Sequence, residues 1–514
     1  MKRIIVLILA LVMVVSCFAA CGDSKGESTP SKQTTPKKDN NDDDVTDDIP
    51  EEEQLNIDLN SIDHEGATVT VFHWKPENGC VEFGMEMDQI NNDAVNDAIY
   101  TRNSRTEEEL GIDIEWVEQN SIYIHMTKFI DKLRSRISDP MTPVDIVAAQ
   151  TKGMPMLITE GLLTDLNAYS DTLDLDKTWW PEDCQDALEI KGNTYFVSGD
   201  ISANLMRMMT VIFVNKTHLE ARGTTYETFM EDIKAHKWTL DKLIEMTEGV
   251  YANRDDNPEP SDGDFFGIVT TYFHSDVLYA GLGYKFMVKS NKDDEVFKLS
   301  PHILTQTTSD YVTKLNDWNK THDMFMDPKE NIYEDAFKNG NALFLLHRAW
   351  FGFELQDTEI NYAVAPAPLL NENQDTYYTT IGNQYSSYGI CSQAPDMNLA
   401  AATIQVLGYN GYKYTTPILF EVSFKGKFSK DDYTVEMFDI IRKGITFDVG
   451  RSFDVFVAGA ASEDRKNMLP NIVSWTIRDA KVWTTEFSSN KQATIRHLIE
   501  DANKKLLDVV NSES

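Results

Sequence analysis

The sequence predicts an α/β protein with more than one domain. Strand-like and helix-like segments alternate from residue 67 onward, the chain has 514 residues, and apolar residues make up 41% of it. Alternating strands and helices are typical of a mostly parallel sheet covered by helices. The part of the chain beyond residue 64 is too long for one ordinary core, so two or three domains are expected.

The first five predicted elements follow the order strand, helix, strand, helix, strand. Alternating β-branched residues predict strands at 67–74 and 112–117, and a short apolar run predicts a buried strand at 144–149. Apolar residues at helical spacing predict helices at 93–110 and 129–137. In such a sheet a ligand crevice lies beyond the carboxyl ends of the strands.

The chain opens with the features of a secretory signal peptide. Two basic residues precede an apolar run from Ile4 to Val15, and small residues follow. This run is shorter than the roughly twenty apolar residues that a membrane span needs. Residues 1–20 are therefore predicted to direct export and to be removed.

The two alanines before Cys21 resemble the end of the lipobox of bacterial lipoproteins. This resemblance implies that Cys21 is acylated, for example with palmitate, and tied to the extracellular face of the cell membrane. Cys17 is a poorer alternative, because cleavage there would leave Phe18 and two alanines in the mature chain. Residues 21–64 are polar and acidic, with too little apolar surface to fold, and are predicted to form a disordered tether.

The formal net charge of −36 argues against nucleic acid as a partner and weakly favours neutral or cationic ligands, although a local pocket can oppose it. No calcium-loop spacing is present, and His73 and His347 are too scattered to predict a metal site. No metal or cofactor is expected. Cys80, Cys184 and Cys391 allow at most one disulfide, and buried free thiols are the preferred interpretation.

Eight short motifs follow one another between residues 67 and 410. In chain order they lie within Asn103–Trp116, Pro143–Val147, Gly161–Leu166, Ile190–Tyr195, Val211–Lys216, Trp238–Leu243, Ala336–Ala342 and Tyr362–Pro368. Their order resembles that of bacterial extracellular solute-binding proteins of the family 1 type, which serve ABC importers. Two positions depart from the usual family motifs: Asn193 follows Gly192, and Thr239 follows Trp238. The chain is therefore a distant match, and its ligand cannot be inferred from the ligands of the family.

The resemblance implies a two-lobed α/β fold of the periplasmic-binding-protein type, type II-like, with a ligand cleft between the lobes. Lobe 1 is expected to hold residues 65–175 plus 345–415, and lobe 2 residues 180–340 plus 420–514. It further implies a monomeric substrate-binding protein that closes on a small solute, most simply a sugar or oligosaccharide, and delivers it to ABC permease subunits.

Candidate ligand-binding residues are aromatic or hydrogen-bonding side chains at predicted strand ends. Sugar rings stack their apolar faces on aromatic rings, and their hydroxyl groups bind polar side chains. The candidates are Trp74, Gln150, Arg348, Trp350, Asn383, Gln384 and Tyr385.

Each candidate has a competing structural interpretation. Trp74 and Trp350 could belong to a lobe core, and Arg348 could hold a carboxylate of lobe 2. Trp179 and Trp180 lie at the expected crossing between lobes, where hinge packing competes with ligand stacking. Three further tryptophans lie within predicted elements and are expected in the core: Trp116, Trp238 and Trp475.

The sequence is compatible with three classes of function. The chain lacks the Gly-x-Ser-x-Gly, His-Glu-x-x-His and phosphate-loop motifs, and its many acidic residues single out no catalytic pair, so no enzyme activity is expected. The preferred hypothesis is a lipid-anchored solute-binding protein of an importer. The alternatives are a cell-surface module that holds a carbohydrate or partner without transport and, less favoured, a carbohydrate-active enzyme.

Overall fold

The computed structural model describes residues 53–55, 57, 66–76, 82–84, 94–120, 122, 125–424 and 432–513. These residues belong to one compact unit, Pro50–Ser514. The predicted signal peptide, both candidate lipidation cysteines and Cys80 lie outside the described residues. The end of the predicted tether differs from expectation, because Leu55 and Ile57 are apolar and pack against the core.

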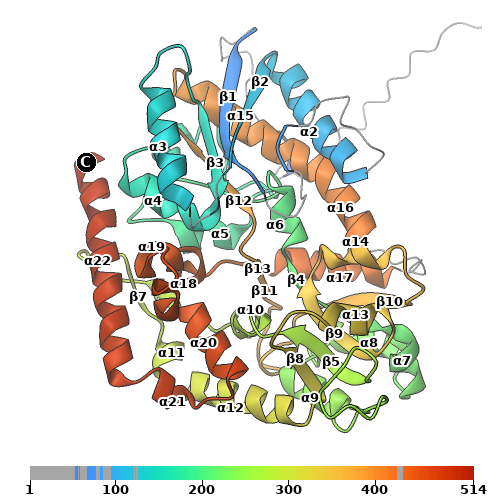
Figure 1. Cartoon of the computed structure of the whole chain (residues 1–514). Coiled ribbons are helices and arrows are strands. Elements are labelled where there is room, and N and C mark those ends of the chain that lie inside the picture. Colours follow the sequence, from blue (N-terminus) through green and yellow to red (C-terminus); the bar gives the residue numbers. More distant parts are fainter. Residues whose placement is uncertain are drawn as a thin grey trace, which may run out of the picture. The chain divides into compact units, whose positions relative to one another are not determined.

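The first sheet forms the centre of lobe 1 (Figure 1). Its strand order is β12-β3-β1-β2, with β1 parallel to both neighbours and β12 antiparallel to β3. The strands are β1 (Thr68–Trp74), β2 (Asp113–Gln119), β3 (Ile146–Gln150) and β12 (Ser386–Ile390). The three strands and two helices predicted between residues 67 and 149 are all present, with ends shifted by a few residues.

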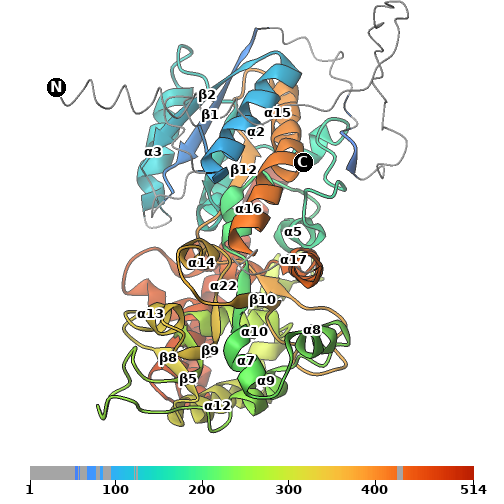
Figure 2. The ribbon, with the colours of Figure 1, turned by 90° about the vertical axis from the view of Figure 1, so that its right-hand side faces the viewer.

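Helices cover the lobe 1 sheet. They are α2 (Ala94–Leu110), α3 (Met126–Ile137), α4 (Met154–Thr159), α15 (Met397–Asn410) and α16 (Thr416–Ser423), with short helical turns η5 (Thr151–Gly153), η6 (Leu166–Tyr169) and η7 (Gly411–Thr415). α2 and α15 lie side by side in both views (Figures 1 and 2). The amide of Asn410 on α15 donates to Thr106 on α2, which fixes the two helices together.

The second sheet forms the centre of lobe 2 and has the order β10-β4-β9-β5-β8. The strands are β4 (Thr210–Asn215), β5 (Phe266–Thr271), β8 (Met324–Asp327), β9 (Ala342–Arg348) and β10 (Tyr362–Pro366). β5 is parallel to β8 and β9, whereas β4 is antiparallel to β9 and β10.

This sheet corrects the expected lobe boundary. Residues 345–366 were expected in lobe 1, but β9 and β10 pair within the second sheet. The apolar run of β9 is buried between β4 and β5, and an apolar strand of this kind is stable only at the centre of a sheet. The chain therefore returns to lobe 1 at β12.

Short helices and a small hairpin surround the lobe 2 sheet. They are α7 (Lys216–Ala221), α8 (Tyr226–Lys234), α9 (Leu240–Thr247), α10 (His274–Gly281), β6 (Met287–Lys289), β7 (Phe297–Leu299), α11 (Pro301–Leu304), α12 (Gln306–Lys320), α13 (Tyr333–Lys338) and α14 (Phe351–Leu355). Several begin at side-chain caps; for example, the hydroxyl of Thr239 accepts from the backbone N–H of Lys242 at the start of α9.

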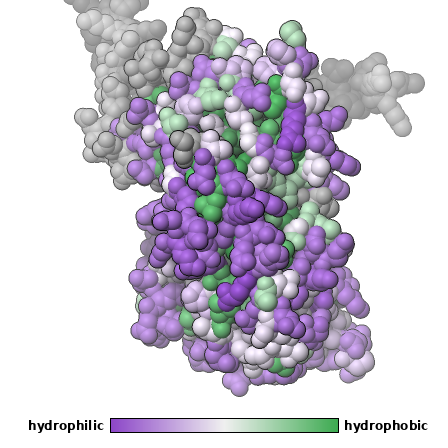
Figure 3. Space-filling view, turned by 90° about the vertical axis from the view of Figure 1, so that its left-hand side faces the viewer, coloured by the Kyte–Doolittle hydropathy of each residue, from purple (hydrophilic) through white to green (hydrophobic). Residues whose placement is uncertain are grey.

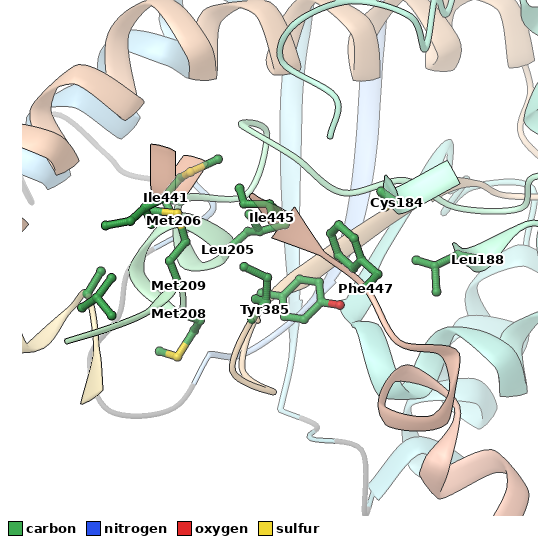
Figure 4. Close-up of a cluster of buried hydrophobic side chains, with 14 of the residues drawn as sticks. Cys184, Leu188, Leu205, Met206, Met208, Met209, Tyr385, Ile441, Ile445 and Phe447 are labelled. Atoms are coloured by element: carbon green, nitrogen blue, oxygen red, sulfur yellow. The ribbon is translucent and has the colours of Figure 1, made fainter. Parts of the chain in front are cut away.

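Within the part of the chain that the structure describes, three segments run between the lobes. The first, which includes α6 (Ala203–Arg207), runs antiparallel to the second, with bridges from Val197 to Tyr388 and from Met209 to Ile381. β11 (Thr379–Thr380) in the second segment pairs in parallel with β13 (Ile445–Thr446) in the third. Figure 4 shows buried apolar side chains from these segments and from α5 (Glu182–Leu188) in one cluster.

The C-terminal helices differ from the expectation that they belong to lobe 2. They are α17 (Tyr433–Lys443), α18 (Val449–Ser452), α19 (Asp454–Ala458), η8 (Asp464–Asn467), α20 (Leu469–Arg478), α21 (Trp483–Glu486) and α22 (Ser489–Glu513). α20 packs on α10 and α12 of lobe 2. In contrast, α19 contacts η5 of lobe 1, and α22 contacts α4 of lobe 1.

α22 contacts both lobes because one apolar stripe follows its length. Ile495, Ile499 and Leu506 are buried at helical spacing, and the side chain of Asn503 exchanges hydrogen bonds with the backbone of Phe297 on β7. Polar residues cover most of the face on this side of the molecule, with small apolar areas between them (Figure 3). The stripe is thus the packing face of α22.

Candidate functional site

The carboxyl edge of the lobe 2 sheet carries a group of half-buried aromatic and cationic side chains. Tyr272 and Phe273 follow β5 directly, and Arg348 ends β9. The parallel register sets Val269 opposite Leu345, so Tyr272 and Arg348 lie at the same level of the sheet. This edge therefore places aromatic rings and a guanidinium side by side, and these groups can stack on a sugar ring and donate hydrogen bonds to it.

The aromatic rings at this edge contact one another and two arginines. The rings of Tyr272 and Phe273 meet edge to face with centroids 5.6 Å apart. The Cζ atom of Arg348 lies 5.4 Å from the centroid of Phe273. Arg478 on α20 lies 5.2 Å from the ring of Tyr272 and 5.6 Å from that of Trp475. α20 thus extends the aromatic surface beyond the sheet.

Trp350 lies two residues beyond Arg348 and remains half-buried. Its backbone N–H donates to the carbonyl of Arg207 in the first crossing segment, 2.9 Å away. Its ring packs with its centroid 5.3 Å from that of His347, and the residue as a whole is partly exposed. The structure is therefore compatible with the predicted stacking role of Trp350, which stays a prediction.

Arg348 has an unusual environment for a half-buried cation. Its Nε is buried without a hydrogen-bond partner, and no ion pair to it is found among the described residues. Burial lowers the pKa of Arg348, while the nearby Tyr333 and Asp276 favour its charged form. The alternative prediction, that Arg348 holds a carboxylate of lobe 2, finds no such partner in this conformation.

The buried histidine His347 precedes Arg348 on β9 and forms hydrogen bonds next to this strand end. Nε2 of His347 lies 3.2 Å from the carboxylate of Glu334 and 3.1 Å from the hydroxyl of Tyr333. Burial lowers the pKa of His347, although Glu334 opposes the shift, so the ring is neutral at pH 7. His347 acts here as a packing and hydrogen-bonding residue.

The lobe 1 side of the junction brings together three of the predicted polar residues. The side-chain amide of Gln150 donates to the carbonyl of Asn383 at 3.0 Å, and Thr151 donates its backbone N–H to the carbonyl of Tyr385. A cavity of about 20 Å³ beside Asn383 and Tyr385 has room only for water. These side chains therefore hold the crossing segment in this conformation.

Two buried ion pairs tie the C-terminal segment to the two lobes. Nε of Arg451 donates to Asp276 of α10 at 2.8 Å, and its Nη1 donates to the carbonyl of Ile381. Nζ of Lys152, in the turn η5 that follows β3, donates to Asp454 at 2.6 Å. We name residues 451–454 the strap, because they bind lobe 2 at one end and lobe 1 at the other.

The other predicted aromatic residues are packed in the interior. Trp74 is 1% exposed and donates its indole N–H to the hydroxyl of Ser386, so no face of its ring is open. Tyr385 is buried in the cluster of Figure 4, beside Phe447. Gln384 is half-buried in the same crossing segment. In this conformation Trp74 and Tyr385 are core residues.

Trp179 and Trp180 pack against lobe 1 near the crossings. Trp179 is fully buried and its ring lies 5.3 Å from that of Tyr409. The indole N–H of Trp180 donates to Gln405 of α15. Both are packing contacts with α15, and the choice between a hinge role and a ligand role for these tryptophans stays a prediction. Trp180 also borders a cavity of about 400 Å³, whose other walls include Asp183, Tyr378 and Arg442.

The described residues show no group of His, Cys, Asp and Glu side chains that could hold a metal ion. Cys184 and Cys391 are free and buried, and burial raises their thiol pKa values to about 12 and about 11. Among the same residues, every helix is either too short or too polar to span a bilayer.

Sequence reasoning missed four residues of the lobe 2 edge. Tyr272 and Phe273 were missed because the strand before them, β5, was not recognised, although Phe266–Thr271 is a short apolar and β-branched run bounded by acidic and aromatic residues. Trp475 was expected in the core, but it is half-buried beside Arg478. The spacing of three between these two residues on one helix could have indicated a shared face.

Comparison with solved structures fits this architecture. A cyclo/maltodextrin-binding protein complexed with maltotetraose matches with a TM-score of 0.51 at 13% identity, over 86% of this chain and 97% of that chain. The chain has the two-lobed fold of solute-binding proteins. The predicted fold class is thereby confirmed.

Two further solved structures match over similar lengths. A family 1 extracellular solute-binding protein from Bifidobacterium longum subsp. infantis gives a TM-score of 0.48 at 15% identity, over 87% of this chain and 100% of that chain. The GacH receptor of Streptomyces glaucescens gives 0.49 at 13% identity, over 86% and 99%. No protein-family model and no curated protein sequence matches the chain.

Proposed function

We propose that the protein is an extracellular solute-binding protein that captures a saccharide at the junction of its two lobes. The observation that carries this proposal is the carboxyl edge of the lobe 2 sheet, where the half-buried residues Tyr272, Phe273 and Trp350 lie near Arg348. Aromatic rings next to hydrogen-bonding side chains match the apolar faces and hydroxyl rims of sugars.

The arrangement of the lobes gives this site its mechanism. The carboxyl end of β9 in lobe 2, at Arg348, and that of β3 in lobe 1, at Gln150, both lie against the crossing segment from Ile381 to Tyr385. A solute bound there would contact both lobes, and closure of the lobes would then bury it. The solved structure that matches with a TM-score of 0.51 was determined with maltotetraose, which supports a saccharide over other small solutes.

A ligand screen tests the proposal on the full chain, purified in mild detergent. Thermal unfolding is measured with a panel of oligosaccharides, amino acids and peptides, and hits are titrated by calorimetry. We expect at least one saccharide to raise the melting temperature, and Trp350→Ala to weaken its binding. Trp116→Ala is the matched control, because Trp116 is also half-buried but lies in the middle of β2, away from the strand ends. Binding of amino acids or peptides alone would overturn the saccharide proposal.

Anchoring and transport extend the proposal. The motif before Cys21 supports acylation and attachment to the outer face of the cell membrane, and the fold supports delivery of the solute to ABC permease subunits. Cys21→Ala should release the folded protein from membranes into the medium. Continued palmitate labelling and membrane retention of this variant would instead assign the lipid to Cys17.

A further inference from the structure

Arg348 is a half-buried cation that forms no ion pair with any described residue. Its Nε is buried and makes no hydrogen bond, and its guanidinium forms no ion pair. Asp276 and Glu330 favour its charged form without pairing with it. A partly buried guanidinium without a paired carboxylate can bind an acceptor from outside the chain.

Three other buried arginines of the protein have acceptors within the chain. Arg102 donates to Asn103 and to the carbonyls of Ile201 and Glu82. Arg442, whose Nε also lacks a hydrogen-bond partner, is paired with Asp200, and Arg451 is paired with Asp276. Each of these three is bound to a carboxylate or to several carbonyls in the protein itself. Arg348 differs from them in lying at a strand end that faces the proposed solute site.

The neighbours of Arg348 restrict the direction from which a ligand can approach. The ring of Phe273 lies against the guanidinium, with 5.4 Å between Cζ and the ring centroid. On another side, a Cβ atom added to Gly382 would lie 2.6 Å from Nε and 3.0 Å from Cδ. Gly382 is held in place by its N–H, which donates to the carbonyl of Met208. The terminal nitrogens therefore remain for a ligand that also touches the aromatic edge.

We propose that the natural ligand is an acidic saccharide whose carboxylate pairs with Arg348. This inference rests on the proposed function and specifies its substrate class. A carboxylate matches the planar guanidinium by two parallel hydrogen bonds, and it neutralises the charge that a sugar hydroxyl would leave uncompensated. The sugar ring of the same residue would then stack on Phe273 or Trp350.

The acidity of the whole chain does not oppose this pairing at physiological salt. Charges more than about 8 Å apart are largely screened at 0.15 M ionic strength, whereas a direct contact in a partly buried site is not. The overall charge of −36 instead predicts a slow approach of the anion, which salt would accelerate. The pairing itself should weaken as salt is raised, because Arg348 is only half-buried.

The test compares the affinities of the unmodified full chain for a charged ligand and for its neutral ester. Trigalacturonate and its methyl-esterified form are titrated by calorimetry, together with maltotriose as a neutral sugar of equal length. We expect trigalacturonate to bind at least about tenfold more tightly than its ester, the effect of one charge-assisted hydrogen bond or more. Tighter binding of the ester or of maltotriose would overturn the acidic-ligand inference and leave the saccharide proposal standing. Binding of none of the three, with no saccharide hit in the wider panel, would overturn both.

Variants locate the effect on Arg348. Arg348→Gln should lower the affinity for trigalacturonate by about ten- to a hundredfold and lower that for the ester by a clearly smaller factor. Arg348→Lys, which keeps the charge but loses the planar geometry, should recover part of the loss and also serves if the Gln variant unfolds. Arg105→Gln removes the same charge from an exposed pair on α2 and should change neither affinity. Equal loss for charged and neutral ligands in Arg348→Gln would contradict the pairing.

Discussion

The strap offers a perturbation whose size follows from the structure. Arg451 and Asp276 form a buried ion pair with 2.8 Å between Nε and Oδ2, and their side chains are 7% and 8% exposed. Asp276→Asn keeps the size of the side chain and one acceptor oxygen but removes the charge. Arg451 then retains the carbonyl of Ile381 and a longer contact to Asn383, neither of which neutralises it.

Breaking a buried ion pair by removal of one partner costs about 3 to 5 kcal/mol, and we expect about 3 kcal/mol here because the amide oxygen still accepts. The entropy of unfolding of a unit as large as Pro50–Ser514 is about 1 kcal/mol/K. The melting temperature should therefore fall by about 3 °C if the unit unfolds cooperatively.

Scanning calorimetry of Asp276→Asn beside the unmodified chain measures this shift. Glu108→Gln is the matched control, because Glu108 pairs with Arg105 at the surface, where ion pairs contribute little. Arg451→Met combined with Asp276→Leu should recover most of the loss, since apolar replacement of both partners removes the buried charges together. An unchanged melting temperature in Asp276→Asn, or additive losses in the double variant, would refute the reasoning.

Three further outcomes are expected. Trp475→Ala should weaken saccharide binding by about 1 to 3 kcal/mol at an unchanged melting temperature, whereas Trp74→Ala should lower the free energy of unfolding by about 3 to 5 kcal/mol. Calorimetry with and without ligand measures both effects. A loss of stability in Trp475→Ala and a loss of binding alone in Trp74→Ala would contradict these roles. Burial lowers the pKa of His73 from 6.5 to about 4, so the folded protein should lose stability as the pH falls from 6.5 to 4. In thermal unfolding over this pH range, the melting temperature of a His73→Phe variant should fall less than that of the unmodified chain. Burial raises the pKa of Asp145 from 3.8 to about 6, so its stabilising contribution is present below pH 3.8 and lost as pH rises through 6; Asp145→Asn should therefore melt at a higher temperature than the unmodified chain at pH 7 but not at pH 4.

Local patterns in the sequence predict most elements of lobe 1. β1 and α2 are recognisable because alternation and helical spacing act within a few residues, and both end within a few residues of the predicted positions. The end of β9 was also predicted, which is why Arg348 and Trp350 were named as candidates. Their final surroundings depend on Phe273 and Arg207, which a local pattern does not relate to them.

Long-range pairing explains what sequence reasoning placed wrongly. Trp74 stands at a strand end, as predicted, but Ser386 covers it from a segment 312 residues further along the chain. Residues 345–366 were assigned to lobe 1 because motif order does not reveal that β9 pairs with β4 and β5. The strap was not anticipated either, since its partners Asp276 and Lys152 lie 175 and 302 residues away from it.

The central claim is that a saccharide binds at the carboxyl edge of lobe 2, between the lobes. A crystal structure of the full chain, grown with the saccharide that gives the largest melting shift, tests this most directly. We predict ligand density in contact with Phe273, Trp350 and Arg348, with atoms of both lobes within hydrogen-bond distance. Ligand density confined to the cavity beside Trp180 and Tyr378, with the lobe 2 edge empty, would contradict the account.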